Sequence, residues 1–166
     1  MRLLRALLGL AAAALIFYLA YRFIVQPRNV IADTITVYYC KTDGETLAPW
    51  KVTLGPARDR KSLAFYAATQ ALAGPPPGVE AIRFPAGSSV RRVDVSGDAV
   101  TLDLNRAAAS QPGGSFAESG EFKALVWTLT ALPGVAKVQV EIEGAVVPTL
   151  PGGHLELDQP LARSNW

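Results

Sequence analysis

Apolar and polar residues follow two different periods along the chain, and these periods predict strands and helices. Five segments alternate apolar and polar side chains residue by residue, which is typical of a strand with one buried face. They are residues 34–40, 49–54, 90–95, 100–104 and 135–142. Two further segments repeat apolar residues at helical spacing, residues 59–73 and a segment that runs from a Ser115 to Glu118 capping box to Leu129. The sequence therefore predicts the order β-β-α-β-β-α-β.

Both predicted helices end at residues that interrupt helical structure. Gly74 can adopt the left-handed conformation that closes a helix, and the prolines at 75–77 cannot continue it. Pro133 and Gly134 end the second helix. Since each helix has one apolar stripe and each strand one apolar face, we expect an α+β two-layer sandwich, with both helices on one face of a single mixed β-sheet. The other face of that sheet is either solvated or a docking surface.

The core prediction concerns the second helix and the last strand. Leu125 and Leu129, one helical turn apart, should pack on Val138 and Val140. The tail from residue 148 onward is punctuated by proline and glycine, and its leucines are available to fix it against the domain. Its structure is left open by the pattern.

The N-terminal segment is long and apolar. A helix over residues 3–25 would reach about 34 Å, enough to cross the hydrocarbon core of a bilayer. The alternative is a cleaved signal peptide, but bulky residues fill 16–19 and 21–25, where a small-x-small cleavage site would lie. We therefore expect an uncleaved signal anchor over residues 1–26, a linker over 27–33 and one domain over 34–166. The chain would be a single-pass protein of the cell membrane, with its C-terminal domain outside the cytoplasm.

The distribution of charge separates the anchor from the domain. The formal net charge is +2, but Arg2, Arg5, Arg22 and Arg28 all flank the apolar segment. The rest of the chain has 12 basic residues against 14 acidic ones. A domain without a strongly positive field is not typical of nucleic-acid binding, so we exclude nucleic acid as a partner.

Few residues in the domain carry candidate chemistry. Cys40 is the only cysteine and His154 the only histidine, which excludes an intramolecular disulfide and disfavours a histidine-based metal site. Asp94, Asp98 and Asp103 suggest a calcium loop, but they lack the ligand spacing of an EF-hand and suit a hairpin turn equally well. No phosphate-binding loop and no GxSxG or SxxK motif is present. We therefore predict no catalytic, cofactor-binding or metal-binding residue, and no enzyme activity.

The tryptophans and the cysteine can each be interpreted in two ways. The tryptophans Trp50, Trp127 and Trp166 could stack on sugars, although isolated aromatic residues more often fill a core or an interface. Cys40 could be a reactive thiol, although burial as a small apolar side chain is favoured. The role of His154 is left open.

Several segments together resemble the GerMN domain, which occurs in GerM-type sporulation and germination proteins and in envelope lipoproteins. They are VYYC at 37–40, ALAGPP at 71–76, FPAG at 84–87 with the hairpin at 90–104, VWTLTALPGVAKVQVEIEG at 126–144, and LELDQPLAR at 155–163. The resemblance covers nearly the whole domain, whereas each motif alone is weak. The chain differs from the lipoprotein members of the family, because its N-terminal segment is plainly apolar and has no lipid-accepting cysteine.

The resemblance implies a non-enzymatic module outside the cytoplasm, similar to ring-building domains of secretion and sporulation machines. The expected partner is another envelope protein or a second copy of the chain. Recognition of a cell-wall glycan or peptide is the alternative, for which an aromatic-lined pocket would be the distinguishing feature. The sequence leaves open the identity of the partner, the oligomeric state and any link to sporulation.

Overall fold

The computed structural model describes residues 14–18, 34–54, 59–110, 114–151 and 155–166. The chain divides into two units, Met1–Ile31 and Ala32–Trp166. In the first unit, residues 14–18 are α-helical and their side chains are exposed. The rest of the expected anchor over 1–26, and the linker over 27–33, lie outside the described residues. Among the described residues, no helix has the length and hydropathy needed to cross a membrane.

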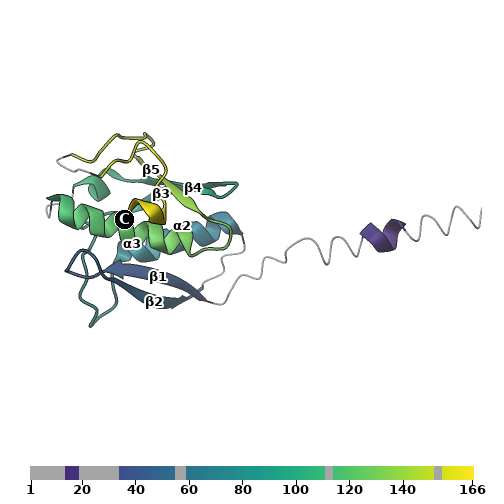
Figure 1. Ribbon diagram of the computed structural model, residues 1–166, viewed down its shortest axis with the longest axis horizontal. Helices are drawn as coiled ribbons and strands as arrows, with labels where there is room; N and C mark the ends of the chain where they lie inside the picture. The colour runs from purple at the N-terminus through teal and green to yellow at the C-terminus, as the bar shows by residue number, and fades with distance from the viewer. Residues whose placement is uncertain (1–13, 19–33, 55–58, 111–113, 152–154) are drawn as a thin grey trace, which may run out of the picture. The chain divides into compact units, whose positions relative to one another are not determined.

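The second unit contains the predicted elements in the predicted order. They are β1 (Thr34–Cys40), β2 (Leu47–Thr53), α2 (Arg60–Ala73), β3 (Val90–Ser96), β4 (Ala99–Leu104), α3 (Gly114–Thr130) and β5 (Lys137–Ile142). Two short 3-10 helices are added, η1 (Arg106–Ala109) and η2 (Arg163–Asn165). The mixed α+β class is therefore confirmed, and Figure 1 shows the arrangement of these elements.

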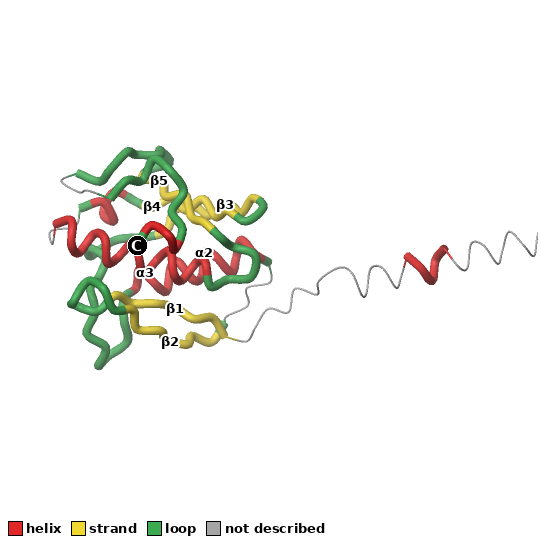
Figure 2. Tube along the Cα trace, in the orientation of Figure 1, coloured by secondary structure: helices red, strands yellow, loops and turns green. Residues whose placement is uncertain are grey.

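The prediction of a single sheet with both helices on one face is wrong. β1 and β2 form an antiparallel two-stranded sheet, whereas β3, β4 and β5 form a separate three-stranded sheet. The second sheet is mixed, because β3 and β4 are antiparallel and β4 and β5 are parallel. Both helices lie between the two sheets (Figure 2), since α2 packs on β1 and β3 and α3 packs on β1 and β5.

The second edge of β1 explains why the sheets stay separate. The backbone N–H of Tyr38 donates to the Thr128 hydroxyl of α3 at 2.9 Å. The carbonyl of Cys40 accepts the N–H of Ile82 at 2.8 Å. A helix side chain and a loop therefore satisfy groups that another strand would otherwise pair with. The alternation of apolar and polar residues along β1 identifies which face of the strand is buried. It does not identify the element that lies next to the edge of the strand.

The core prediction is confirmed for burial and for the elements involved. Leu125, Leu129 and Val138 are fully buried, Val140 is 1% exposed, and all four belong to one apolar cluster. The C-terminal tail also joins this cluster. It contributes Leu150, Leu157 and Leu161. A backbone bridge between Leu161 and Val138 holds the tail along the edge of β5.

The outer face of the three-stranded sheet is covered by its own charged side chains. Arg92 on β3 reaches Glu141 on β5 at 2.9 Å, across the intervening strand. Arg91 lies 3.2 Å from the buried carboxylate of Asp103, which also accepts the N–H of Gly144 at 2.8 Å. This face is therefore polar, and ion pairs between its strands hold its side chains in place.

The two helices begin and end for different reasons. Asp59 caps α2, its carboxylate accepting the N–H of Ser62 at 2.7 Å, and Gly74 ends the helix with φ of 86° as predicted. The expected capping box of α3 is wrong. Ser115 lies inside the helix, which begins at Gly114, and the buried carboxylate of Glu118 accepts the N–H of Leu155. The acid therefore fixes the C-terminal tail.

Gly120 allows the middle of the domain to pack closely. A Cβ atom at this position of α3 would lie 2.7 Å from Cδ1 of Ile82 and 3.1 Å from Sγ of Cys40. Only a residue without a side chain therefore lets the end of β1 and the loop after α2 approach α3 this closely.

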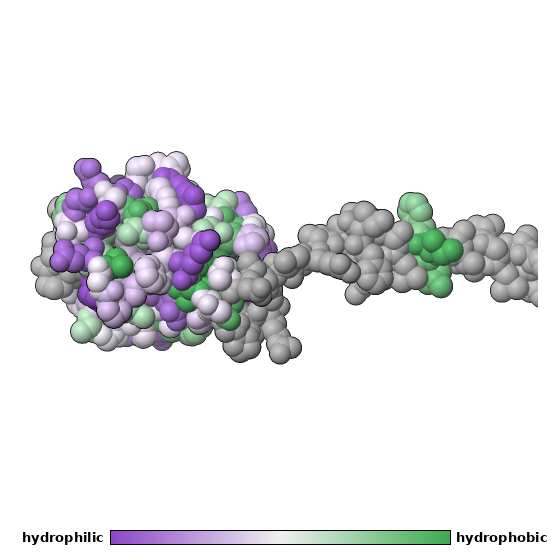
Figure 3. Space-filling model, turned by 90° about the horizontal axis from the view of Figure 1, so that it is seen from below, coloured by the Kyte–Doolittle hydropathy of each residue, from purple (hydrophilic) through white to green (hydrophobic). Residues whose placement is uncertain are grey.

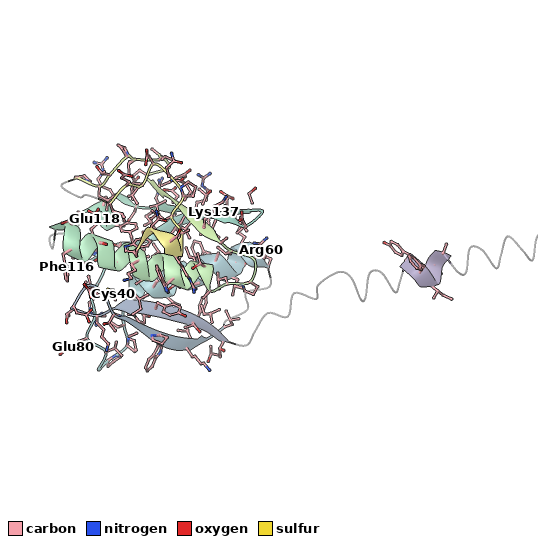
Figure 4. The ribbon with its side chains drawn as sticks, viewed as in Figure 1. Cys40, Arg60, Glu80, Phe116, Glu118 and Lys137 are labelled. Atoms are coloured by element: carbon pink, nitrogen blue, oxygen red, sulfur yellow. The ribbon has the colours of Figure 1, made fainter. Side chains whose placement is uncertain are left out.

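The connections between elements differ at the two ends of the domain (Figure 4). At one end, where β1 begins, Arg60 donates to the carbonyls of Gly97 and Gly134 at 2.9 and 2.8 Å and so joins two turns to α2. The longer loops gather at the other end, near the labelled Glu80 and Phe116. Elements therefore meet by short turns at one end and by loops at the other.

Candidate interaction surface

The residues first considered for chemistry are held in structural contacts. Cys40 is 1% exposed, as expected for an apolar role, and burial raises the pKa of its thiol. His154 lies outside the described residues. A thiol that is buried and held protonated is a poor nucleophile.

The three aspartates of the suggested calcium loop do not converge. Asp94 pairs with Lys61 at 2.8 Å, and Asp98 pairs with Lys137 at 3.7 Å. Asp103 is bound to Arg91. Within the described ranges, no group of three or more His, Cys, Asp or Glu side chains is placed to hold a metal ion.

Two open hollows flank Arg83 in the loop that follows α2. Their volumes are about 460 and 520 Å³, and small residues make up most of the lining of both. The guanidinium of Arg83 lies against Gly74 and donates to the carbonyl of Pro75 at 3.5 Å. Its position at the end of α2 suits a residue that closes a helix, because cations favour helix C-termini.

The structure brings two of the three tryptophans together. Trp127 on α3 and Trp166 after η2 meet edge to face, with ring centroids 5.8 Å apart and an interplanar angle of 74°. The indole N–H of Trp166 donates to the hydroxyl of Ser119 at 3.1 Å, so the C-terminal segment folds back onto α3. Trp50 is not part of this pair. It lies on β2 opposite Val37 and is 45% exposed.

Two cations lie over the ring of Trp127. Lys123 is 5.8 Å and Arg163 is 5.6 Å from its centroid, within the range of a cation–π interaction. Lys123 also donates to the carbonyl of Glu45 at 3.0 Å. Arg163 donates to the Thr130 hydroxyl at 2.8 Å and to the Trp127 carbonyl at 3.2 Å.

Phe116 extends this group toward the start of α3. It is seven residues before Lys123 and eleven before Trp127, so the three lie on one stripe of the helix. Its ring packs against Gly44 in the β1–β2 turn and still leaves 56% of the residue exposed. We call this set the α3 aromatic face: Phe116, Lys123, Trp127, Arg163 and Trp166. In Figure 1, η2 lies directly against α3 on the side that faces the viewer.

The sheet edges are poor sites for adding another strand. The N–H of Tyr38 points to α3, so its partner Pro49 has its nitrogen on the free edge of β2, where proline offers no donor. A bulge interrupts β3 between Val90 and Arg92. Such features protect edges from strand pairing. Among the described residues visible on the hairpin side, apolar ones form only small separate areas (Figure 3).

The sequence indicated Trp127 and Trp166 as separate aromatic candidates, but it did not bring them together, and it did not indicate Phe116, Lys123 or Arg163. The spacing of Lys123 and Trp127 is visible in the sequence, because residues four apart share one side of a helix. The contribution of Arg163 and Trp166 depends on the C-terminal segment folding back over α3, which no local pattern reveals. The distance between these segments along the chain hides the site.

Comparisons with known proteins agree with the resemblance found in the sequence. A family model described as "Germane: Sporulation and spore germination" matches residues 36–148. The first GerMN domain of the sporulation protein GerM from Bacillus subtilis is 21% identical with a TM-score of 0.64, covering 80% of this chain and 99% of that one. The tandem GerMN domains of the same protein are 20% identical with a TM-score of 0.65, covering 81% of this chain and 48% of that one.

A third solved structure extends the likeness to another organism. It is a candidate lipoprotein from Clostridium perfringens, 17% identical with a TM-score of 0.59, and the match covers 83% of this chain and 93% of that one. No curated protein matches the chain. At these levels of identity, the solved structures show a shared fold.

Proposed function

Because the chain belongs to the Germane family of sporulation and spore germination domains, we propose that it is a non-catalytic domain of the bacterial cell envelope that acts by binding another protein. The relatives of this fold include a sporulation protein and a candidate lipoprotein, which supports a place outside the cytoplasm. The partner is an envelope protein or a second copy of the chain. Cell-wall glycan binding is the competing function.

The α3 aromatic face is the observation that carries this proposal. Tryptophan and arginine are enriched at the energetic centres of protein interfaces, where aromatic rings bury large areas. This face holds two tryptophans, an arginine and a phenylalanine that is 56% exposed. Because the sheet edges disfavour pairing with another strand, binding through side chains is favoured over addition of a strand.

A non-enzymatic role is supported by how the polar residues are used. Asp94, Asp98 and Asp103 each pair with a basic residue, and Cys40 packs against α3. A general base or nucleophile needs a reactive group that is free to meet a substrate. These residues serve the fold instead.

The proposal includes a single-pass anchor over residues 1–26, with the domain outside the cytoplasm. The apolar composition of this segment supports it. Confinement to a membrane surface raises the effective concentration of two tethered partners, so a weak contact through the α3 aromatic face suffices. Sequencing the N-terminus of membrane-extracted protein tests the anchor, and a mature protein that begins near Tyr21 would contradict it.

Photo-crosslinking in living cells tests the interaction. A benzoyl-phenylalanine replaces Phe116 on the α3 aromatic face, and in a matched control it replaces Phe65, which is 42% exposed on α2. We expect a discrete protein adduct from position 116 and none from position 65. No adduct from either position, together with retention of the protein on purified cell wall, would replace this proposal with glycan binding.

A further inference from the structure

We infer that the α3 aromatic face binds an acidic protein segment, whose carboxylates pair with Lys123 and Arg163 beside the two indole rings. The inference rests on the proposed function, because it names the chemistry of the partner that the same face takes. Lys123 and Arg163 thereby have two roles: they contact other residues of the domain, and they bind the carboxylates of the partner.

Both cations keep hydrogen-bond donors available. A lysine ammonium has three N–H donors and an arginine guanidinium has five. Lys123 uses one donor on the carbonyl of Glu45, and Arg163 uses two on Thr130 and Trp127. All three acceptors are uncharged oxygens, so these bonds position the cations without neutralising them.

The basic residues of the three-stranded sheet provide the contrast. Arg91, Arg92 and Lys137 each lie within 4 Å of a carboxylate of the same chain. Over the described part of the chain, neither Lys123 nor Arg163 forms such an ion pair. Positive charge is therefore balanced on the sheet and left unbalanced at the aromatic face, although acidic residues outnumber basic ones beyond residue 28. Complementary charge is how an interface selects its partner.

The spacing of the two cations suits neighbouring acidic residues. Lys123 and Arg163 each lie less than 6 Å from the same ring centroid, so their separation is at most about twice that distance. Alternate residues of an extended segment are about 7 Å apart and point to the same side. Two carboxylates at this spacing can reach both cations while an apolar side chain contacts Phe116 or Trp166.

The same geometry disfavours a sugar at this face. Stacking on a sugar requires an open aromatic face, and Lys123 and Arg163 both lie over the ring of Trp127. The edge-to-face contact between Trp127 and Trp166 covers a further part of the aromatic surface. A carbohydrate would have to displace a cation, whereas a carboxylate would bind it.

Binding of a defined peptide tests the inference. The full chain in detergent is titrated into a fluorescent 12-residue peptide made of repeated Glu-Ser-Glu-Leu, and anisotropy reports binding. We expect affinity to fall about tenfold or more in Lys123→Glu/Arg163→Glu. It should also fall with added salt and be lost when every Glu of the peptide is Gln. Lys51→Glu, at an exposed position of β2, is the control for reversal of a single charge outside this face and should bind as the native chain does.

A second variant guards against loss of folding. Lys123→Gln/Arg163→Gln removes both charges without adding repulsion, and thermal unfolding shows whether it retains the fold. Equal affinity for the Glu and Gln peptides, or native affinity in a folded double variant, would overturn the inference.

The crosslinking at position 116 separates the two proposals. If the protein adduct persists in Lys123→Glu/Arg163→Glu, the domain binds a protein but the partner is not acidic at this face. If the native chain gives no adduct, the proposed function itself fails.

Discussion

Adding a single methyl group at Gly120 should destabilise the domain, although it improves the helix. Gly→Ala inside a helix is intrinsically favourable by about 1 kcal/mol. At this position the new Cβ would lie 2.7 Å from Cδ1 of Ile82 and 3.1 Å from Sγ of Cys40, both closer than an ordinary van der Waals contact. Excess volume in a packed interior costs about 1–3 kcal/mol. The net expectation is a loss of about 0–2 kcal/mol in the free energy of unfolding.

A second substitution isolates the steric term. Ile82→Val removes Cδ1, the atom in the closest contact, and should itself cost no more than about 1.5 kcal/mol. In that background Gly120→Ala should be close to neutral, because the closest contact is relieved, and the helix gain then offsets the remaining 3.1 Å contact with Sγ of Cys40. The four proteins form a double-mutant cycle with an expected coupling energy of about 1–2 kcal/mol.

Urea denaturation followed by circular dichroism measures all four free energies of unfolding. Both single variants must keep the native dependence on urea for the comparison to hold. If Gly120→Ala alone stabilises the protein by about 1 kcal/mol, or if the two substitutions are additive, the close approach of the Ile82 loop to α3 is not what requires glycine here.

Three further predictions test the core, the β1–β2 turn and the thiol. Leu129→Ala should cost about 2–5 kcal/mol in chemical denaturation, because the side chain is fully buried, and a change below about 0.5 kcal/mol would contradict this packing. Asp43 accepts hydrogen bonds from Thr46 and Glu45, which lower its pKa to about 2, so its stabilising effect should be present above pH 4 and disappear as the pH falls toward 2. Unfolding midpoints should therefore drop less over this range in Asp43→Asn than in the native chain, and parallel curves would refute the assignment. Cys40 should react with a thiol reagent far more slowly in the native protein than in urea, and equal rates would show that the buried position is wrong.

The order of elements was predictable because local chemistry determines it. Gly74 and the prolines after it end α2, and alternation along β1 and β5 marks their buried faces. The division into two sheets was not predictable in this way. It depends on Thr128 of α3 bonding to the edge of β1, a contact between residues 90 positions apart. Hydrophobic periodicity describes each strand alone and contains no information about its neighbour.

The candidate surface shows a similar limit. Lys123 and Trp127 could be placed on one side of a helix from spacing alone. Glu118 and Glu121 are 3% and 2% exposed, although acidic residues in a helix are ordinarily expected at its surface. Glu118 is buried because it binds the backbone of Leu155, and the tail that carries this partner has no regular pattern. Residues whose role depends on the returning tail were therefore the hardest to interpret.

The separation of the two sheets gives the domain a mechanical weak point. Tension transmitted along the chain from its N-terminal side enters at Thr34 and loads β1 first. Within the described domain, β1 transfers this load to β2 through their ladder and to α3 through the Tyr38–Thr128 bond and the packing at Gly120. The three-stranded sheet shares no ladder with β1. In single-molecule pulling from residue 34 against an attachment on α3, the hairpin should therefore detach before the sheet yields, and rupture in one step would show that the helices couple the two sheets rigidly.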